Sequence, residues 1–303
     1  MVLIMSVVAV TPEAQAQAIA NYKYQGVKKL KLSSFSGVTY NGRSTLTVPT
    51  GQTFDAFMFN TNLPLERLEI TFRLNSNAFI SGIPATFFQT LEQYKQMDVP
   101  AALAPQGEQV FIVSFADLSL KLKDGQQLTS LVTMLGESLQ IQVDIGAKQD
   151  GDPEMPTLEV IAEVNTPQAV RMYLPRIERL QIDMPAQGTN TFNTLPNDMK
   201  RSIRRMHFMT DAIEELEIKR DDNVAYETTA WRECYMANRN DLMWQQGMFH
   251  LDFLMRGFIR NEMFPTARAK ELLFTFKTSK PAGSVTVITE YLDVERTAAQ
   301  VAG

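Results

Sequence analysis

The chain has 303 residues, of which 45% are apolar and 21% are charged, and its formal net charge at pH 7 is -5. This composition is typical of a globular protein and excludes a disordered one. The length is sufficient for two domains that each bury a core. The acidic balance argues against a surface that neutralises phosphates, and therefore against direct nucleic-acid binding.

An apolar stretch, Met1 to Val10, precedes the first predicted strand. It is short and no Lys or Arg comes before it, so neither a secretory signal nor a bilayer-spanning helix of about 20 residues is predicted. We expect residues 1–21 to form an N-terminal arm. Two placements stay open: contact with a neighbouring subunit or a lipid surface, or docking as a strand or helix on its own domain.

Short strands with alternating apolar residues dominate the first half of the chain. In SLQIQVDIG, for example, Leu139, Ile141 and Val143 share one face and the polar residues between them share the other. Pro84 favours the first turn of a helix, and the aromatic and Leu residues that follow it form one apolar stripe. The predicted strands are residues 27–32, 45–48, 53–60, 65–74, 109–121, 138–146 and 157–164.

The second half of the chain repeats the pattern of the first. Residues 65–95 begin with LERLEI, pass the polar turn Asn75-Ser76-Asn77 and end in a short amphipathic helix. Residues 213–239 begin with IEELEI, pass Asp221-Asp222-Asn223 and end in a similar helix around Trp231. The flanking segments recur in the same order, namely VKKLKL with IERLQI, FIVSF with FHLDF, LQIQV with LLFTF and LEVIAE with VTVITE. Such a repeat predicts one β-rich unit present twice.

Each unit contains roughly eight short strands separated by Pro, Gly, Asn and Asp, with one helix inserted in the middle. This pattern predicts an all-β protein with two jelly-roll β-sandwiches in tandem, each with a short inserted helix. Strands and helices do not alternate regularly, so a parallel α/β sheet is excluded. The linker at residues 165–168 predicts domains at 22–167 and 168–303.

Few residues suggest catalysis. The chain has two histidines, His207 and His250, one in each of two predicted strands. Metal sites need more ligands than this, so both are expected to be half buried in strand packing. His250 and Asp252 share a strand face, but no serine lies in a distinctive nucleophile turn, so no catalytic triad is predicted. Neither a catalytic residue nor a cofactor-binding site is therefore expected.

The loop QDGDPE provides the one weak candidate for a metal site. Asp150, Asp152 and Glu154 alternate along it, as oxygen ligands of a structural cation such as calcium do. The complete calcium loop is absent because Ile161 occupies the position of its closing glutamate. A solvated hairpin loop is the preferred interpretation.

One basic cluster is present, formed by Lys200, Arg201, Arg204 and Arg205. Alternation along a strand divides it between two faces, which favours a solvated or subunit-contact surface over a nucleic-acid groove. The single cysteine, Cys234, excludes an intrachain disulfide framework and fits synthesis in a reducing compartment. It is expected to be a small buried side chain on the second helix.

The ordered duplication, with its LNSN turn, its ISGIPATFFQTLEQYK helix and its final GSVTVITEYLD segment, resembles the double jelly-roll major capsid proteins of membrane-containing icosahedral bacteriophages, most closely the corticovirus type. The resemblance covers roughly residues 27–293. It implies a virion protein, made in the host cytoplasm, whose homotrimers present six sandwiches in a nearly hexagonal outline. It also implies contacts with neighbouring trimers, a penton protein and an internal membrane.

Two other functions compete with the capsid subunit. A phage receptor-binding or carbohydrate-binding jelly-roll spike predicts an exposed aromatic platform on one loop face. A sandwich-fold hydrolase has no residue set that supports it. Because some 300 residues form a framework with no convergent polar site, the sequence favours an assembly subunit.

Overall fold

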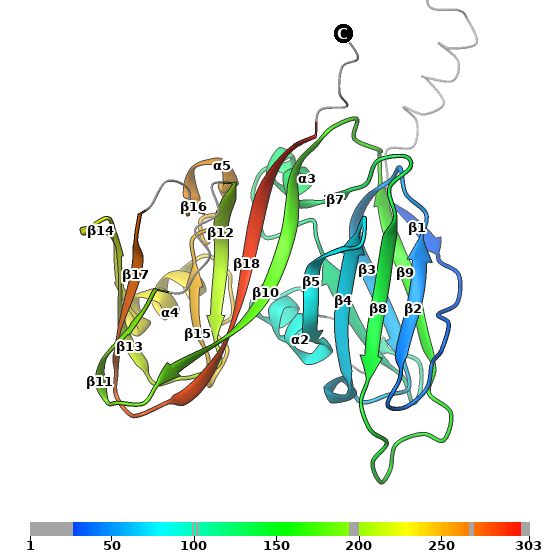
Figure 1. Ribbon diagram of the computed structural model, residues 1–303, viewed down its shortest axis with the longest axis horizontal. Helices are drawn as coiled ribbons and strands as arrows, with labels where there is room; N and C mark the ends of the chain where they lie inside the picture. The colour runs from blue at the N-terminus through cyan, green and yellow to red at the C-terminus, as the bar shows by residue number, and fades with distance from the viewer. Residues whose placement is uncertain (1–26, 99, 101–102, 194–199, 267–269, 298–303) are drawn as a thin grey trace, which may run out of the picture.

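The computed structural model describes residues 27–98, 100, 103–193, 200–266 and 270–297. Two β-sandwiches lie side by side, and the long strands β10 (Arg171–Met184) and β18 (Gly283–Thr297) run between them (Figure 1). The N-terminal arm expected at residues 1–21 lies outside the described residues, so its role stays a prediction.

The first sandwich consists of two antiparallel sheets. One has the strand order β1-β9-β3-β6, with the short β7 beside β3, and the other has the order β5-β4-β8-β2. The strands are β1 Lys28–Lys31, β2 Arg43–Val48, β3 Thr53–Thr61, β4 Leu68–Leu74, β5 Asn77–Pro84, β6 Gln109–Ser114, β7 Leu131–Val132, β8 Leu139–Ile145 and β9 Leu158–Asn165.

The second sandwich has the orders β10-β18-β12-β15, with β16 beside β12, and β14-β13-β17-β11. Its remaining strands are β11 Gly188–Phe192, β12 Arg201–Phe208, β13 Ile213–Arg220, β14 Asn223–Thr229, β15 Phe249–Asp252, β16 Phe264–Pro265 and β17 Leu272–Thr278.

Strand pairing in the two sandwiches is equivalent. In the first sandwich β1 pairs with β9, and β3 lies between β9 and β6. In the second sandwich β10 pairs with β18 in the same way, and β12 lies between β18 and β15. β4 lies between β5 and β8 as β13 lies between β14 and β17. The duplication predicted from the sequence is therefore confirmed as a duplication of topology, and the chain is a double jelly roll.

Each sandwich encloses its own apolar core. Strand β8 shows the alternation directly, since Leu139, Ile141 and Val143 are fully buried and the residues between them are not. The first core contains a stacked pair, Phe59 and Phe111, with ring centroids 4.7 Å apart. A fully buried side chain of this size contributes roughly 1.5–3 kcal/mol. Such alternation explains why these segments form two-layer sheets.

Matching hairpins follow β4 and β13. Asn75 and Ser76 have φ angles of 49° and 69°, and Asp221 and Asp222 have φ angles of 49° and 67°. Two consecutive left-handed residues form a turn of type I′, whose twist suits a tight antiparallel hairpin. The return strands β5 and β14 were missed in the sequence analysis, which expected the helix soon after the turn. They lack clean alternation because β5 is irregularly paired and β14 is largely exposed.

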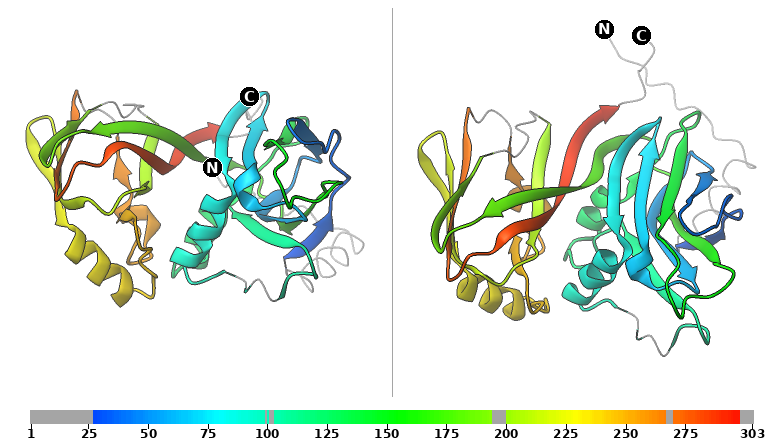
Figure 2. Two further views of the ribbon diagram at one scale, coloured as in Figure 1. Left: turned by 90° about the horizontal axis from the view of Figure 1, so that it is seen from below. Right: turned by 60° about the horizontal axis from the view of Figure 1, so that its bottom comes forward.

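Helices follow both hairpins, as predicted. α2 (Ala85–Tyr94) begins after Pro84, which is its N-cap rather than part of its first turn. α4 (Ala230–Arg239) begins after Thr229, whose hydroxyl accepts a hydrogen bond from the Arg232 amide at 3.2 Å. Figure 2 shows α2 and α4 on the same side of the molecule. Further short helices that the sequence analysis did not predict are η1 Leu65–Arg67, α3 Lys123–Thr129 and α5 Ile259–Glu262.

Strand β6 is shorter than predicted, because it ends at Ser114 rather than near residue 121. The amides of Phe115 and Ala116 both donate to the Asp55 carbonyl, at 2.8 and 2.9 Å, which breaks the ladder. The next residue, Asp117, then points towards the second sandwich. Within the described part of the chain, no helix is long and apolar enough to cross a membrane.

Candidate functional site: the junction between the two sandwiches

Strand β12 carries three arginines at the junction, and all three side chains are buried. Arg201, Arg204 and Arg205 are 7%, 3% and 0% exposed. The expectation that this cluster forms a solvated or subunit-contact surface is therefore wrong for the three arginines, and only Lys200, which precedes the strand, is exposed.

Two features explain this burial. Strand β12 contains a bulge against β18, where Ile203 pairs with Tyr291 and Arg205 pairs with Glu290, so Arg204 is an extra residue. The bulge brings the guanidinium groups of Arg204 and Arg205 to the same carboxylate, with contacts of 2.8 and 3.8 Å to Glu290. Helix α2 of the first sandwich then covers this face.

Arg205 links the two sandwiches directly. Its guanidinium donates to Asp252 at 2.7 Å on the neighbouring strand β15, and to Asp117 at 2.5 Å and Ser119 at 3.2 Å in the first half of the chain. Burial alone would lower the pKa of Arg205, but the surrounding carboxylates raise it well above its ordinary value. Burial alone would likewise raise the pKa of Asp117, but the Arg205 charge holds it well below its usual range. Both groups therefore stay ionised.

The two histidines form a pair that the sequence analysis did not predict. His207 of β12 and His250 of β15 are cross-strand partners, and their Nδ1 atoms lie 2.8 Å apart. Nε2 of His207 lies 3.0 Å from Glu290. Burial would raise the pKa of Glu290, but Arg204 and the His207 hydrogen bond hold it far below its usual range. This ionised carboxylate can only accept, so Nε2 of His207 carries a proton.

His250 is neutral in this arrangement. Burial first, and then the electrostatic effect of the neighbouring His207, lower the pKa of His250 to about 2. Its Nε2 has no hydrogen-bond partner among the described residues. Both histidines are 1% exposed, so the expectation of half-buried packing underestimated their burial.

Helix α2 seals the histidine pair from the other side. The Tyr94 hydroxyl donates to Asp252 at 3.2 Å, and the Tyr94 ring lies 4.5 Å from the His250 ring. Phe87 meets His207 edge-on at 5.3 Å. The Tyr94 carbonyl also accepts from the Met243 amide of the second sandwich at 2.7 Å. The last turn of α2 is thus fixed by both backbone and side chain.

Further ion pairs extend the junction along β10. Arg176 donates to Asp293 at 2.7 Å and to the Ala78 carbonyl of the first sandwich at 3.1 Å. The Arg171 guanidinium donates two hydrogen bonds to the Glu137 carboxylate, each of 2.8 Å. Bidentate Arg–carboxylate pairs of this kind add orientation as well as energy. The second sandwich is therefore fixed to the first at several points along the strand.

The sheets themselves are also joined. Strand β10 pairs in parallel with β5 at Ile177 and Ile80, which makes one nine-stranded sheet of the adjacent sheets of both sandwiches. Arg179 lies across this seam 3.3 Å from Glu69. The junction thus combines a short backbone pairing with a buried ionic network.

The chemistry of this junction is structural. Arg205, His207, His250, Asp252 and Glu290 are each at most 3% exposed, so a substrate has no access to them. No group of three or more His, Cys, Asp or Glu side chains in the described ranges can hold a metal ion. The arrangement can fix two sandwiches in one orientation, because removal of Arg205 leaves buried carboxylates on both sandwiches without their shared cation.

The predicted cation loop does not bring its three carboxylates together. Asp152 accepts from Arg67 at 3.2 Å and from the Gln149 amide at 2.8 Å, and Glu154 accepts from Lys148 at 2.7 Å. Asp150 is exposed. The loop is held by ion pairs of its own, and the calcium interpretation gains no support from the geometry. Cys234, expected to be buried, is half-buried.

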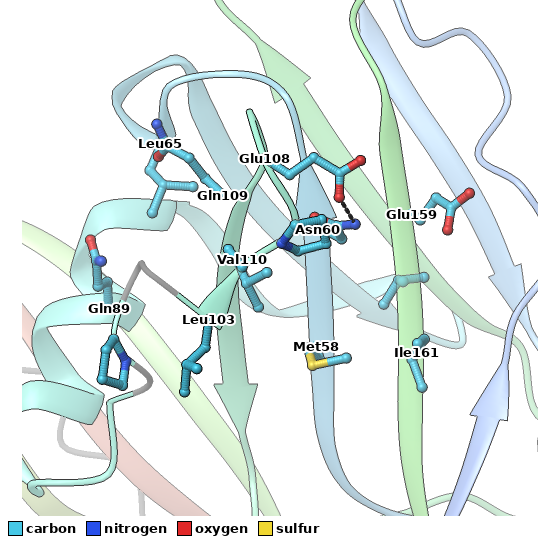
Figure 3. A pocket seen from close by; sticks show the side chains of 14 residues that line it. Met58, Asn60, Leu65, Gln89, Leu103, Glu108, Gln109, Val110, Glu159 and Ile161 are labelled. Carbon is cyan, nitrogen blue, oxygen red and sulfur yellow. Dashed lines mark hydrogen bonds between the residues drawn. The ribbon is translucent and has the colours of Figure 1, made fainter.

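A second feature is an apolar cavity of about 600 Å³ on the outer face of the sheet that contains β3, β6 and β9. Figure 3 shows Met58, Val110 and Ile161 on its floor, with Leu103 facing them from the neighbouring loop. Glu108 and Glu159 lie at its rim, and Glu108 accepts a hydrogen bond from the Asn60 amide. No sequence signal pointed to this cavity.

Comparisons with known proteins agree with this architecture. Residues 29–165 match the family model described as viral coat protein P2 N-terminal domain, and residues 174–295 match viral coat protein P2 C-terminal domain. No curated protein sequence matches the chain.

Capsid proteins are among the solved structures with the same fold. The major capsid protein P2 from bacteriophage PM2 has a TM-score of 0.76 at 15% identity, with 90% of this chain and 99% of that chain covered. The major capsid protein of STIV, the Sulfolobus turreted icosahedral virus, has a TM-score of 0.65 at 10% identity, covering 91% and 99%. A PBCV-1 virus capsid protein has a TM-score of 0.59 at 6% identity, covering 89% and 94%. At these identities the likeness establishes the fold.

The two family matches together span most of the chain, and their order is the order of the two sandwiches. They favour a shell subunit over a spike, and the stacked pair Trp231 and Tyr235 lies on a helix rather than on a loop face. The chain belongs to the viral coat protein P2 family, and it is a capsid component of a virion.

Proposed function

We propose that the chain is a structural subunit whose homotrimers present six sandwiches in a nearly hexagonal ring and tile an icosahedral shell. The observation that carries this proposal is the junction described above. Two sandwiches of equivalent topology are fixed to each other by Arg205, Asp117 and a continuous sheet. Three such rigid pairs have the symmetry that a six-sided tile requires.

The neighbours of such a trimer are other trimers, a penton protein and an internal lipid membrane. The apolar segment Met1 to Val10 supports a membrane contact through residues 1–21. The net charge of -5 supports a protein that does not bind nucleic acid directly. Deletion of residues 2–20 tests the arm, because particles that form normally and are equally stable without it contradict the membrane role.

We assign no catalytic role to the chain. Arg205, Asp117 and Glu290, whose pKa values are strongly shifted, lie in the sealed junction and not in an open cleft, as the groups of a structural ion-pair network do. We propose domains at residues 22–167 and 168–303, and the passage of the chain from the first sandwich to the second after β9 supports this division.

The trimer is tested by measuring the mass of the purified chain in solution by light scattering and analytical ultracentrifugation. We expect a species of three times the 34.2 kDa chain mass across a wide concentration range. A protein that stays monomeric at every concentration, and that is missing from the shell of purified particles, contradicts the proposal. A glycan array tests the spike alternative, for which no binding is expected.

A further inference from the structure

One end of the molecule carries a group of exposed apolar side chains. The loops that follow β6, β7, β9 and β15 lie at this end, beside helices α3 and α5 (Figure 1). We call it the α3–α5 surface and define it as residues 118–124, 133–136, 169–172 and 256–261. Its large apolar side chains, with exposed fractions between 40% and 88%, are Leu118, Leu122, Leu135, Val170, Met172 and Phe258. Exposed apolar side chains gathered on one surface mark a contact with a protein or a membrane.

Both sandwiches contribute to this surface, and they are packed together there. The Lys121 amide donates to the Gly257 carbonyl at 3.2 Å, which joins the loop before α3 to the loop before α5. Gly257 has a φ angle of 85°, and a Cβ atom at this position would lie 2.9 Å from the Lys121 side chain, so the close approach requires glycine. Beneath them Leu120 packs in a small buried core with Leu254 and Ile259. The α3–α5 surface is therefore a fixed part of the fold.

An apolar groove of about 260 Å³ opens on this surface between the two loops. Leu122 and Phe258 line it together with Ile259 of α5. The charged residues Asp124 and Arg260 lie beside them. A groove with an apolar lining and a few polar groups suits an amphiphilic molecule, whose chain enters the groove while its head stays at the surface.

Cations without a carboxylate partner surround the apolar side chains. Lys123 and Arg260 are exposed, and neither forms an ion pair with another described residue. The Lys121 ammonium lies 5.6 Å from the centre of the Phe258 ring, so this cation is held over an apolar residue. The chain as a whole has a net charge of -5, which makes such a group of cations unusual on its surface. Apolar side chains with cations around them are typical of surfaces that bind anionic lipid headgroups.

The position of this surface in the proposed shell limits what can cover it. The two sandwiches stand side by side in Figure 1 with their strands roughly aligned, so copies that complete a ring of sandwiches contact their sides. The α3–α5 surface lies at the ends of the strands, and it therefore faces either the outside or the interior of the shell. On the outside, exposed apolar side chains promote aggregation.

The ends of the described chain favour the interior. Lys28, the first residue of β1, pairs with Val164 near the end of β9, and Thr297 at the end of β18 pairs with Arg171. Both positions are at the same end of the molecule as the α3–α5 surface. Residues 1–21 are therefore attached to the folded part of the chain at this end, and their sequence begins with an apolar stretch. Two apolar features thus share one end of the subunit.

We propose that the α3–α5 surface faces the internal membrane and binds anionic lipid headgroups directly. Leu122 and Phe258 reach below the headgroups, and Lys123 and Arg260 contact the lipid phosphates. The contact does not depend on residues 1–21, because every side chain in it belongs to the folded sandwiches. This inference rests on the proposed shell, and it adds the orientation of the subunit and the class of lipid.

Flotation of the purified full-length chain with vesicles tests the contact. We expect the trimer to float with vesicles of phosphatidylglycerol and phosphatidylcholine in equal parts, and to bind more weakly to phosphatidylcholine alone. Leu122→Ser is expected to weaken binding by about tenfold, because a large apolar side chain no longer enters the lipid. Met155→Ser is the control, since Met155 is 79% exposed in the loop before β9, at the opposite end of the molecule. Thermal unfolding is expected to be unchanged in both variants.

A charge reversal tests the headgroup contact. Each cation close to an anionic membrane strengthens binding by about fivefold, so Lys123→Glu is expected to weaken binding to the anionic vesicles by more than about tenfold. Binding of this variant to phosphatidylcholine alone is expected to be unchanged. Lys148→Glu makes the same change in the loop at the opposite end and is expected to alter neither. Equal loss in both variants contradicts a specific surface.

Fluorescence shows which end enters the lipid. With brominated acyl chains, Phe258→Trp is expected to lose more emission than the wild type does, and Met155→Trp is not. If the variants at the α3–α5 surface bind as the wild type does, this surface is not the lipid contact. If wild-type trimers form but float with neither vesicle, something other than lipid covers it. Both results overturn the inference and leave the trimer intact, whereas a wild-type chain that forms no trimer contradicts the proposed function on which the inference rests.

Discussion

Arg205 in β12 and Asp117, at a distance of 88 positions in the sequence, form a 2.5 Å ion pair that is almost completely closed to solvent. This contact joins the two sandwiches of one chain. Replacing Arg205 by Met leaves Asp117, Asp252 and Glu290 without their common cation. Breaking a buried pair in this way is expected to lower the free energy of unfolding by about 3–5 kcal/mol.

Urea denaturation of Arg205→Met measures this loss. Arg43→Met is the matched control, because Arg43 pairs with Asp144 at the surface, where the two side chains are 54% and 35% exposed. The control is expected to lose less than about 1 kcal/mol. A loss of similar size in both variants contradicts a special role for the junction.

The histidine pair predicts a pH dependence of stability. His250 has a folded-state pKa of about 2, against an ordinary value of 6.5. Below pH 6.5 the unfolded chain therefore binds a proton that the folded chain does not, so the free energy of unfolding falls as the pH falls. The slope attributable to His250 approaches about 1.4 kcal/mol per pH unit.

Urea denaturation at pH 7.5, 6.5 and 5.5 measures how the free energy of unfolding changes over this range, which lies above the pKa of ordinary carboxyl groups. The pKa values of Asp117 and Glu290 are lowered by folding, so their ionised forms stabilise the fold fully above the unfolded-state pKa of about 4. This stabilisation is lost only when the pH falls below that value, which is outside the range of the titration. His250→Asn is expected to flatten the profile between pH 7.5 and 5.5. An unchanged slope in this variant shows that another group is responsible.

Tyr94 tests the contribution of helix α2 to the junction. Tyr94→Phe removes the hydroxyl that donates to Asp252 and is expected to cost about 1–2 kcal/mol of unfolding free energy. Tyr235→Phe makes the same chemical change on the exposed face of α4, and its effect on the monomer is expected to be near zero. Thermal unfolding followed by circular dichroism distinguishes the two, and equal shifts in Tm contradict the assignment.

The paired hairpin turns allow a test of the internal duplication. Ser76 and Asp222 occupy left-handed backbone positions with φ angles of 69° and 67°. Glycine adopts this conformation without the Cβ clash, so Ser76→Gly and Asp222→Gly are each expected to stabilise the fold, by up to about 1 kcal/mol. Ser33→Gly, at an exposed serine without this geometry, is expected to be neutral or slightly destabilising. Opposite signs for the two turn variants contradict equivalent turns.

The sequence was sufficient to predict the duplication and most of the strands. Alternation such as that of Leu139, Ile141 and Val143 depends only on neighbours along the chain, and the ordered repeats identified which strands correspond. The jelly-roll class followed from these local patterns. The bounds of β6 did not, because Asp55, on a different strand, determines where β6 ends.

The junction could not be predicted in the same way. Arg201, Arg204 and Arg205 form a basic run that is typical of a solvated face. The burial of Arg205 depends on Asp117, which lies 88 positions away, and that of Arg201 on Asp293, which lies 92 positions away. The proximity of His207 and His250 depends on the register of β12 against β15. One signal of the junction was available in the sequence, because the charged residues of this strand lie among apolar ones. If such a strand is buried, its charged side chains require partners of opposite charge.

The parallel pairing of β5 with β10 has a mechanical consequence. Because β10 pairs with β5 at Ile177 and Ile80 and buried ion pairs lie beside this contact, the two lobes cannot hinge against each other without breaking both. A shell assembled from such braced chains takes up its curvature where separate molecules touch and not within one molecule.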